Sequence, residues 1–71
     1  MIQERLLGLR KAHHINQQEF ADLLGITVQT YRLKELGQLE FKASEMFTIA
    51  RYFNKKIDDI FLDIIHQNGV K

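Results

Sequence analysis

Apolar residues recur at helical spacing in five separate stretches of the chain. In the first stretch, Ile2, Leu6 and Leu9 follow one another at intervals of four and three positions, with three polar residues between the first two. This spacing is typical of a helix that buries one face. Similar stretches cover about residues 17–24, 28–36, 43–53 and 57–62. The pattern therefore predicts five helices and an all-α fold.

Specific residues mark the boundaries of the second and third predicted helices. Asn16 precedes the second helix and Glu19 stands three positions later, which is the pattern of a capping box. Gly25 ends this helix, because glycine readily adopts the left-handed conformation that often follows a helix. Thr27 is placed to cap the third helix.

The connection between these two helices favours one arrangement. Gly25, Ile26 and Thr27 leave too little chain for the helices to lie antiparallel. A short turn containing glycine suits the angled crossing of a helix-turn-helix. We therefore predict this motif over about residues 17–36, and it is the most specific local signal in the sequence.

The apolar residues spaced for burial in the second and fourth helices are Phe20, Ala21, Leu23, Leu24, Met46, Phe47, Ile49, Ala50 and Phe53. The fifth helix runs from Ile57 to about Leu62. Two alternatives stay open for residues 62–71: Ile64 and Ile65 extend the helix, or a strand precedes the turn-prone Asn68-Gly69. The extended form is slightly favoured.

Length and composition narrow the class of protein. A chain of 71 residues forms one small domain, 1–71, and it has no cysteine for disulfides or a zinc site. No apolar run is long enough to span a membrane, and the N-terminal residues lack the layout of a secretory signal. These features predict a cytoplasmic protein.

The charge is distributed unevenly along the chain. Residues 1–56 carry a net charge of +3 and residues 57–71 a net charge of −2, for a total of +1. A basic body is compatible with one face that meets phosphates. Ordinary solvated surface explains the charge equally well, so charge alone does not decide the function.

The stretch from Leu9 to Phe61 resembles the phage repressor and Cro-type helix-turn-helix family, also called XRE-like regulators. The motifs that carry the resemblance are LRKAHHINQQEFADLLGIT, VQTYRLKELG and EFKASEMFTIARYFNKKIDDIF. The resemblance implies a compact five-helix, lambda-repressor-like DNA-binding domain that regulates transcription. It is strongest to short regulators of Gram-positive bacteria and their prophages.

Three positions depart from the family's pattern. Val28 stands where many members have serine or arginine, which bears on base preference. Lys42 and Lys56 stand where the family often caps a helix with serine or threonine, which bears on the stability of the fourth and fifth helices.

The third helix is the predicted DNA-recognition element, because a helix fits the major groove, where each base pair presents a distinct pattern of groups. Tyr31 is expected to face inward, together with Leu33 or the stem of Lys34. Gln29 can pair with adenine, and Arg32 with guanine or a phosphate. The candidate DNA-binding residues are Gln17, Thr27, Val28, Gln29, Thr30, Arg32, Lys34 and Lys42.

The other candidates have simpler roles. Val28 or Thr30 can touch a thymine methyl group. Gln17 lies in the first turn of a helix, where the resemblance implies a phosphate contact and the free N–H groups favour an anion. The candidate phosphate contacts that set register are Arg10, Lys11, Lys34 and Lys42. Each of these residues could instead be solvated or packed.

Little in the sequence supports catalysis or metal binding. His13 and His14 are adjacent and cannot share a helical face, and His66 is remote. The acidic residues near the fifth helix suit its dipole and the solvent. We find no phosphate-binding glycine loop and no nucleophile with a plausible base. We expect no cofactor, no metal, no small-molecule ligand and no enzymatic activity.

A single helix-turn-helix contacts few base pairs, so we expect a homodimer on a pseudo-palindromic operator in double-stranded DNA. The candidate dimerisation residues are Ile57, Ile60, Leu62, Ile64 and Ile65. The first hypothesis is a transcriptional regulator, a repressor or Cro-like switch protein of a prophage or mobile element. The alternative is a protein-interaction module, antitoxin-like or adaptor, with the same fold. A purely structural bundle is the least favoured.

Overall fold

A computed structural model describes residues 2–61 of the chain, and within this range it contains helices and no strands. The elements are α1 (Glu4–Ala12), α2 (Gln17–Leu24), α3 (Val28–Glu35) and α4 (Ala43–Phe53). Residues 57–61 are helical up to the last described position. The predicted five-helix, all-α fold is confirmed. The predicted extended segment, 62–71, lies outside the described residues.

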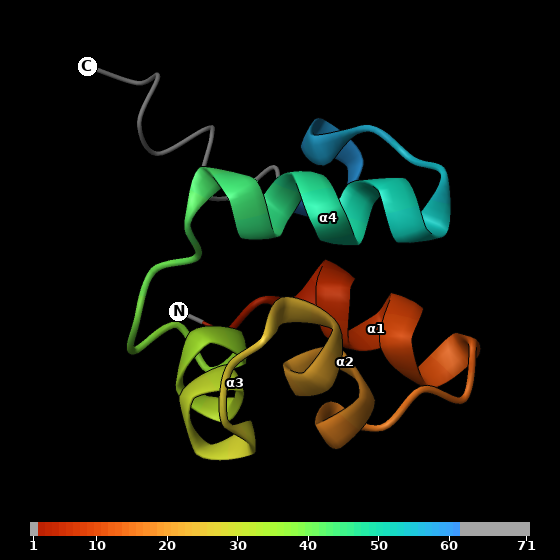
Figure 1. Cartoon of the computed structure of the whole chain (residues 1–71). Coiled ribbons are helices and arrows are strands. Elements are labelled where there is room, and N and C mark those ends of the chain that lie inside the picture. Colours follow the sequence, from red (N-terminus) through yellow and green to blue (C-terminus); the bar gives the residue numbers. More distant parts are fainter. Residues whose placement is uncertain (1, 62–71) are drawn as a thin grey trace.

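The helices are arranged so that α4 lies at the opposite end of the molecule from α3 in the view of Figure 1. The core between the helices holds the side chains of Leu6, Ile15, Phe20, Ala21, Tyr31, Phe41, Ile49, Ala50, Ile60 and Phe61. Aromatic rings meet edge to face within it. Phe41, from the loop before α4, contacts Tyr31 at 6.1 Å and Phe61 at 5.2 Å between ring centroids. This loop residue therefore joins α3 to the C-terminal helix.

Ile2, expected on the buried face of the first helix, lies before the start of α1 and is exposed. In the second and fourth helices, two residues predicted to be buried are also exposed. Leu23 has 41% of its surface exposed and Phe47 has 60%. Each is one position away from a residue that faces the core, Leu24 or Met46. One position turns a side chain by about 100° around the helix, enough to carry it off the buried face. The apolar stripe on these helices is narrower than the sequence pattern predicted.

The helix ends follow the chemistry of their capping residues. In the predicted capping box of α2, the Glu19 N–H donates to Asn16 Oδ1 and the Asn16 N–H donates to Glu19 Oε1, both at 2.8 Å. At α4, the Lys42 ammonium group cannot accept a hydrogen bond, so only half of this arrangement forms. The Lys42 N–H donates to Glu45 Oε1 at 2.8 Å.

Candidate nucleic-acid interface

The turn between α2 and α3 sets the angle between these two helices. Gly25 adopts the left-handed conformation with φ 73°, and the following N–H, that of Ile26, donates to the Ala21 carbonyl at 2.9 Å. The Ile26 side chain packs against the core. Thr27 then caps α3, since its Oγ1 accepts from the Thr30 N–H at 3.1 Å. Gly25, the packed Ile26 side chain and the Thr27 cap together form the turn of the predicted helix-turn-helix.

One face of α3 is buried and the other is exposed. Tyr31, Lys34 and Glu35 point into the molecule with exposed fractions of 0%, 6% and 4%. The exposed residues are Gln29, Arg32, Leu33 and Leu36, at positions i, i+3, i+4 and i+7 of a single helical face. The predicted inward position of Tyr31 is confirmed, and the open choice between Leu33 and Lys34 is resolved in favour of Lys34.

Lys34 is buried because its charge is compensated. Its ammonium group donates to Glu45 Oε1 at 2.8 Å and to the Glu40 carbonyl at 3.0 Å. The same group lies 5.8 Å from the centre of the Phe41 ring. A buried ammonium group with these partners is poorly placed to meet a phosphate, so we leave Lys34 out of the interface that we propose.

A second buried ion pair fixes the inner side of α3 to α1. Arg10 donates to both carboxylate oxygens of Glu35, at 2.8 Å from Nε and 3.0 Å from Nη2, and to the Ile15 carbonyl at 2.8 Å. The Tyr31 hydroxyl donates to Glu35 Oε2 at 2.8 Å. Arg10, like Lys34, is thus a structural cation and not a free phosphate contact.

The environment of Glu35 favours its ionised form. Burial alone would raise the pKa of this carboxyl group, but hydrogen bonds from Arg10, Gln17 and Tyr31 outweigh burial and lower the pKa below its ordinary value. Burial raises the pKa of Tyr31, and the neighbouring Glu35 charge raises it further. At neutral pH the cluster therefore holds one guanidinium cation, one carboxylate and a neutral phenol.

Gln17 connects this buried cluster to the exposed face of α3. Its Nε2 donates to Glu35 Oε1 at 2.9 Å, and its Oε1 accepts from Arg32 Nε at 3.0 Å. The side chain is partly buried. The amide thus has a protein partner at each end, an arrangement that the sequence pattern did not predict.

The remaining predicted DNA-binding residues lie in three environments. Gln29, Arg32, Thr27 and Lys42 are exposed. Thr30 is partly buried, and its Oγ1 accepts from the Thr27 hydroxyl at 2.9 Å. Val28 packs against the core, which limits the surface that it can offer to a base. Leu33, one of the two alternatives for the inward face, is exposed instead, between Arg32 and the end of α3.

The predicted dimerisation residues differ in how far they are buried. Ile60 has an exposed fraction of 2%, so it belongs to the core of one chain and is not free to contact another. Ile57 is partly buried and borders an open depression of about 410 Å³ beside α4. The depression is lined by Phe47, Ala50, Arg51, Asn54, Lys55, Lys56 and Ile57. The candidates Leu62, Ile64 and Ile65 lie outside the described residues.

Two properties of residues 2–61 bear on other functions. No three metal-binding side chains in this range come close enough together to hold an ion. None of the helices in this range has the length and apolar character needed to cross a membrane.

Comparisons with known proteins agree with the geometry. A family described as Helix-turn-helix matches residues 6–60. An uncharacterized HTH-type transcriptional regulator of Methanocaldococcus jannaschii is 33% identical over 61 residues, which cover 86% of this chain and 92% of the relative. This match bears on the family and not on the narrower resemblance to regulators of Gram-positive bacteria. No solved structure matches the chain.

Proposed function

Because this chain belongs to the helix-turn-helix family of DNA-binding transcriptional regulators, we propose that it recognises an operator through the outer face of α3. The observation that carries the proposal is the division of this helix into a buried face and an exposed one. Gln29, Arg32 and Leu33 project from the exposed face. Their side chains offer an amide, a guanidinium group and an apolar surface, which are the groups that distinguish base pairs in the major groove.

Each of these residues has a role in the proposed complex. Gln29 pairs with adenine and Arg32 with guanine, while Leu33 touches a thymine methyl group. Thr27, Thr30 and Lys42 contact phosphates and set the register of the helix on the duplex. Val28 contributes at most an edge contact because it packs against the core. The chain acts as a repressor or Cro-like switch protein and performs no catalysis.

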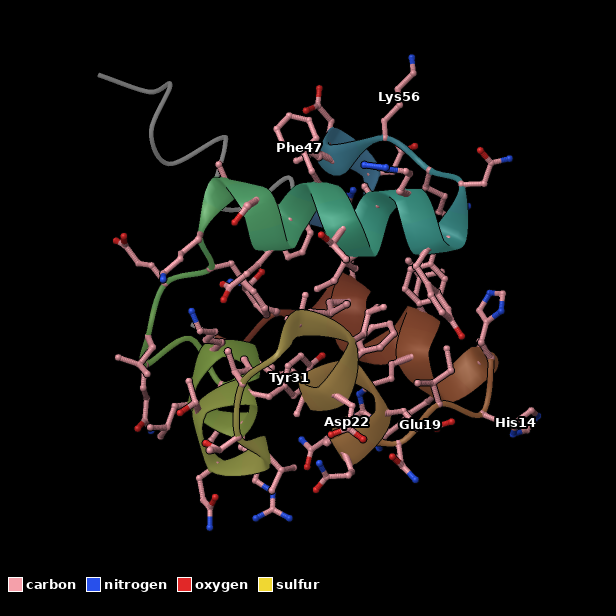
Figure 2. The ribbon with its side chains drawn as sticks, in the orientation of Figure 1. His14, Glu19, Asp22, Tyr31, Phe47 and Lys56 are labelled. Carbon is pink, nitrogen blue, oxygen red and sulfur yellow. The ribbon has the colours of Figure 1, made fainter. Side chains whose placement is uncertain are left out.

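We further propose that two copies bind a pseudo-palindromic operator, because one short helix spans only a few base pairs. The dimer contact includes Phe47 and Ile57, which face the depression beside α4, and the C-terminal Leu62, Ile64 and Ile65. Figure 2 shows Phe47 and Lys56 on the side of α4 away from Tyr31. Three cationic side chains, Arg51, Lys55 and Lys56, border this depression. They complement the C-terminal part of a second copy, in which residues 57–71 carry a net charge of −2 and Asp63 stands between the apolar residues.

The experiment is a selection of binding sites from random duplex DNA, repeated on Gln29→Ala and Arg32→Ala. Each variant should lose base preference at its own position in the half-site and keep it elsewhere. Arg5→Ala is a control for Arg32→Ala, since it removes the same charge from an exposed position of α1, outside both the proposed interface and the depression beside α4. It should weaken binding slightly for all sequences. A chain that enriches no sequence would contradict the proposal.

Salt dependence separates this proposal from a protein-interaction module. The exposed Phe47 among cations is the observation that favours such a module. A regulator should bind its selected duplex with an affinity that falls steeply as salt rises, and a specific site should survive excess competitor DNA. A module that docks a protein should show neither behaviour.

A further inference from the structure

We infer that Gln17 is a positioning residue that holds Arg32 in the orientation needed to bind guanine. This inference rests on the DNA-binding function proposed above. Its basis is the hydrogen bond of 3.0 Å from Arg32 Nε to Gln17 Oε1, which ties the exposed face of α3 to the first turn of α2. Arg32 is thereby restrained before any DNA arrives.

The orientation of the Gln17 amide is set by the buried carboxylate behind it. Ionised Glu35 only accepts hydrogen bonds, so the amide must turn its NH₂ group inward, where Nε2 donates to Glu35 Oε1 at 2.9 Å. Its oxygen must then point away from Glu35, toward Arg32. Glu35 is itself held by two hydrogen bonds from Arg10 and one from Tyr31. The buried Glu35 carboxylate therefore restrains Arg32 through the Gln17 amide.

The bond to Nε determines which atoms of Arg32 remain for DNA. The two terminal nitrogens, Nη1 and Nη2, are left as a planar pair of donors. This pair matches O6 and N7 of guanine, the two acceptors that an arginine binds together in the major groove. A restrained guanidinium group also loses less conformational freedom on binding than a free one. Arg32 is thus prepared for a base contact.

This geometry gives Gln17 a role different from the predicted phosphate contact. Its oxygen, already an acceptor for Arg32, faces the outer side of the motif. An acceptor oxygen cannot form a hydrogen bond to a phosphate oxygen, and one of the two Nε2 hydrogens is already donated to Glu35, so at most one donor of this side chain remains for DNA. Gln17 acts through Arg32, so its removal should change base preference more than general affinity.

The test is a double-mutant cycle on Gln17→Met and Arg32→Met. For each chain, affinity is measured for the selected operator and for the same duplex with adenine in place of the guanine assigned to Arg32. The wild-type chain should prefer guanine by roughly 5- to 150-fold. Either substitution should reduce this preference at least about fivefold, and the double variant should lose no more than Arg32→Met alone.

Two further variants keep the test decisive. Gln18→Met is the matched control, because Gln18 is exposed on the same turn and donates only to Asp22 Oδ1 at 2.8 Å; it should keep the guanine preference. Arg32→Lys leaves the Glu35 cluster intact and keeps the charge, but its flexible ammonium group lacks the planar donor pair that Gln17 orients. It should retain general affinity and lose most of the guanine preference, even if Gln17→Met fails to fold.

Two results would overturn the inference. One is a Gln17→Met chain that binds all duplexes equally less well, with the same loss in the Arg32→Met background, as a phosphate contact would give. The other is an Arg32→Lys chain that keeps the full guanine preference of the wild-type chain. A wild-type chain that selects no sequence is a different result, because it would overturn the proposed function itself.

Discussion

Lys34 on α3 and Glu45 on α4 form a buried ion pair, with 2.8 Å between the Lys34 nitrogen and the Glu45 oxygen. The side chains have exposed fractions of only 7% and 9%. The pair joins α3 to α4. Its contribution to stability is strongest when both partners are present, because either charge alone would be buried without compensation.

Glu45→Gln should therefore destabilise the chain by about 3–5 kcal/mol, since it leaves the Lys34 ammonium group without a countercharge. The amide oxygen of the new side chain can still accept from the Lys42 N–H. The double variant Lys34→Met, Glu45→Gln removes both charges and should recover much of the loss. Unfolding in urea measures all three chains. Equal stability of the two variants would show that the loss in Glu45→Gln does not come from an uncompensated Lys34 charge.

Acid should destabilise the chain through Glu35 and Glu45. Burial works to raise both pKa values, but hydrogen bonds, chiefly from Arg10 to Glu35 and from Lys34 to Glu45, lower them below the ordinary 4.5. A carboxyl group with a lowered pKa in the folded state stabilises the fold fully above its unfolded pKa. This stabilisation is lost as the pH falls from about 4.5 through the folded pKa.

The free energy of unfolding, measured between pH 7 and pH 3, should fall most steeply below about pH 4.5. Glu35→Gln should be less stable at neutral pH and show a shallower decline, because one of the two titrating groups is gone. An unchanged slope in this variant would exclude Glu35 as a source of the acid response.

Gly25 should resist replacement for a conformational reason alone. Its φ is 73°, and a Cβ added there would meet no atom within 4 Å. Gly25→Ala should thus destabilise the chain by about 1–2 kcal/mol through backbone strain, without a clash. Gly8 is the matched control, because it lies inside α1 with equally open space.

Gly8→Ala should stabilise the chain by about 0.5–1 kcal/mol, since alanine loses less backbone freedom in a helix. Thermal unfolding of the two variants should therefore shift in opposite directions. If both unfolding temperatures shifted in the same direction, the turn would not need the left-handed conformation at position 25.

Phe47→Ser should weaken the proposed dimer while leaving the fold nearly unchanged. The ring is 60% exposed, so little core packing is lost. Sedimentation at micromolar concentration should show a shift toward monomer. Leu23→Ser, which changes an apolar residue that is 41% exposed on α2, is the control and should not alter the assembly. An identical dimer in both variants would place the contact elsewhere.

The helix boundaries could be predicted because their causes are local. Asn16, Gly25 and Thr27 act on residues within four positions, and each forms the predicted hydrogen bond or backbone conformation. The outward position of Gln29 and Arg32 followed from helical periodicity once Tyr31 was assigned to the core. Sequence spacing was sufficient for these features.

The buried polar clusters could not be predicted in the same way. Arg10 and Glu35 are 25 positions apart, and only the packing of α1 against α3 brings them together. One local signal existed: Arg10 falls four positions after the buried Leu6, on the same face of α1. A charged residue at such a position indicates a buried partner, but its identity depends on the tertiary arrangement.

The division of α3 into two faces also governs how this chain can change over evolution. Substitutions at Gln29 or Leu33 alter the surface that meets DNA in the proposed complex, while the anchored side of the helix stays the same. If this proposal holds, descendants can acquire new target sites by changing these positions without rebuilding the domain. Position 32 is less free, because a replacement there leaves the Gln17 oxygen without its partner. We expect the residues at positions 17 and 32 to vary together among descendants that bind different operators.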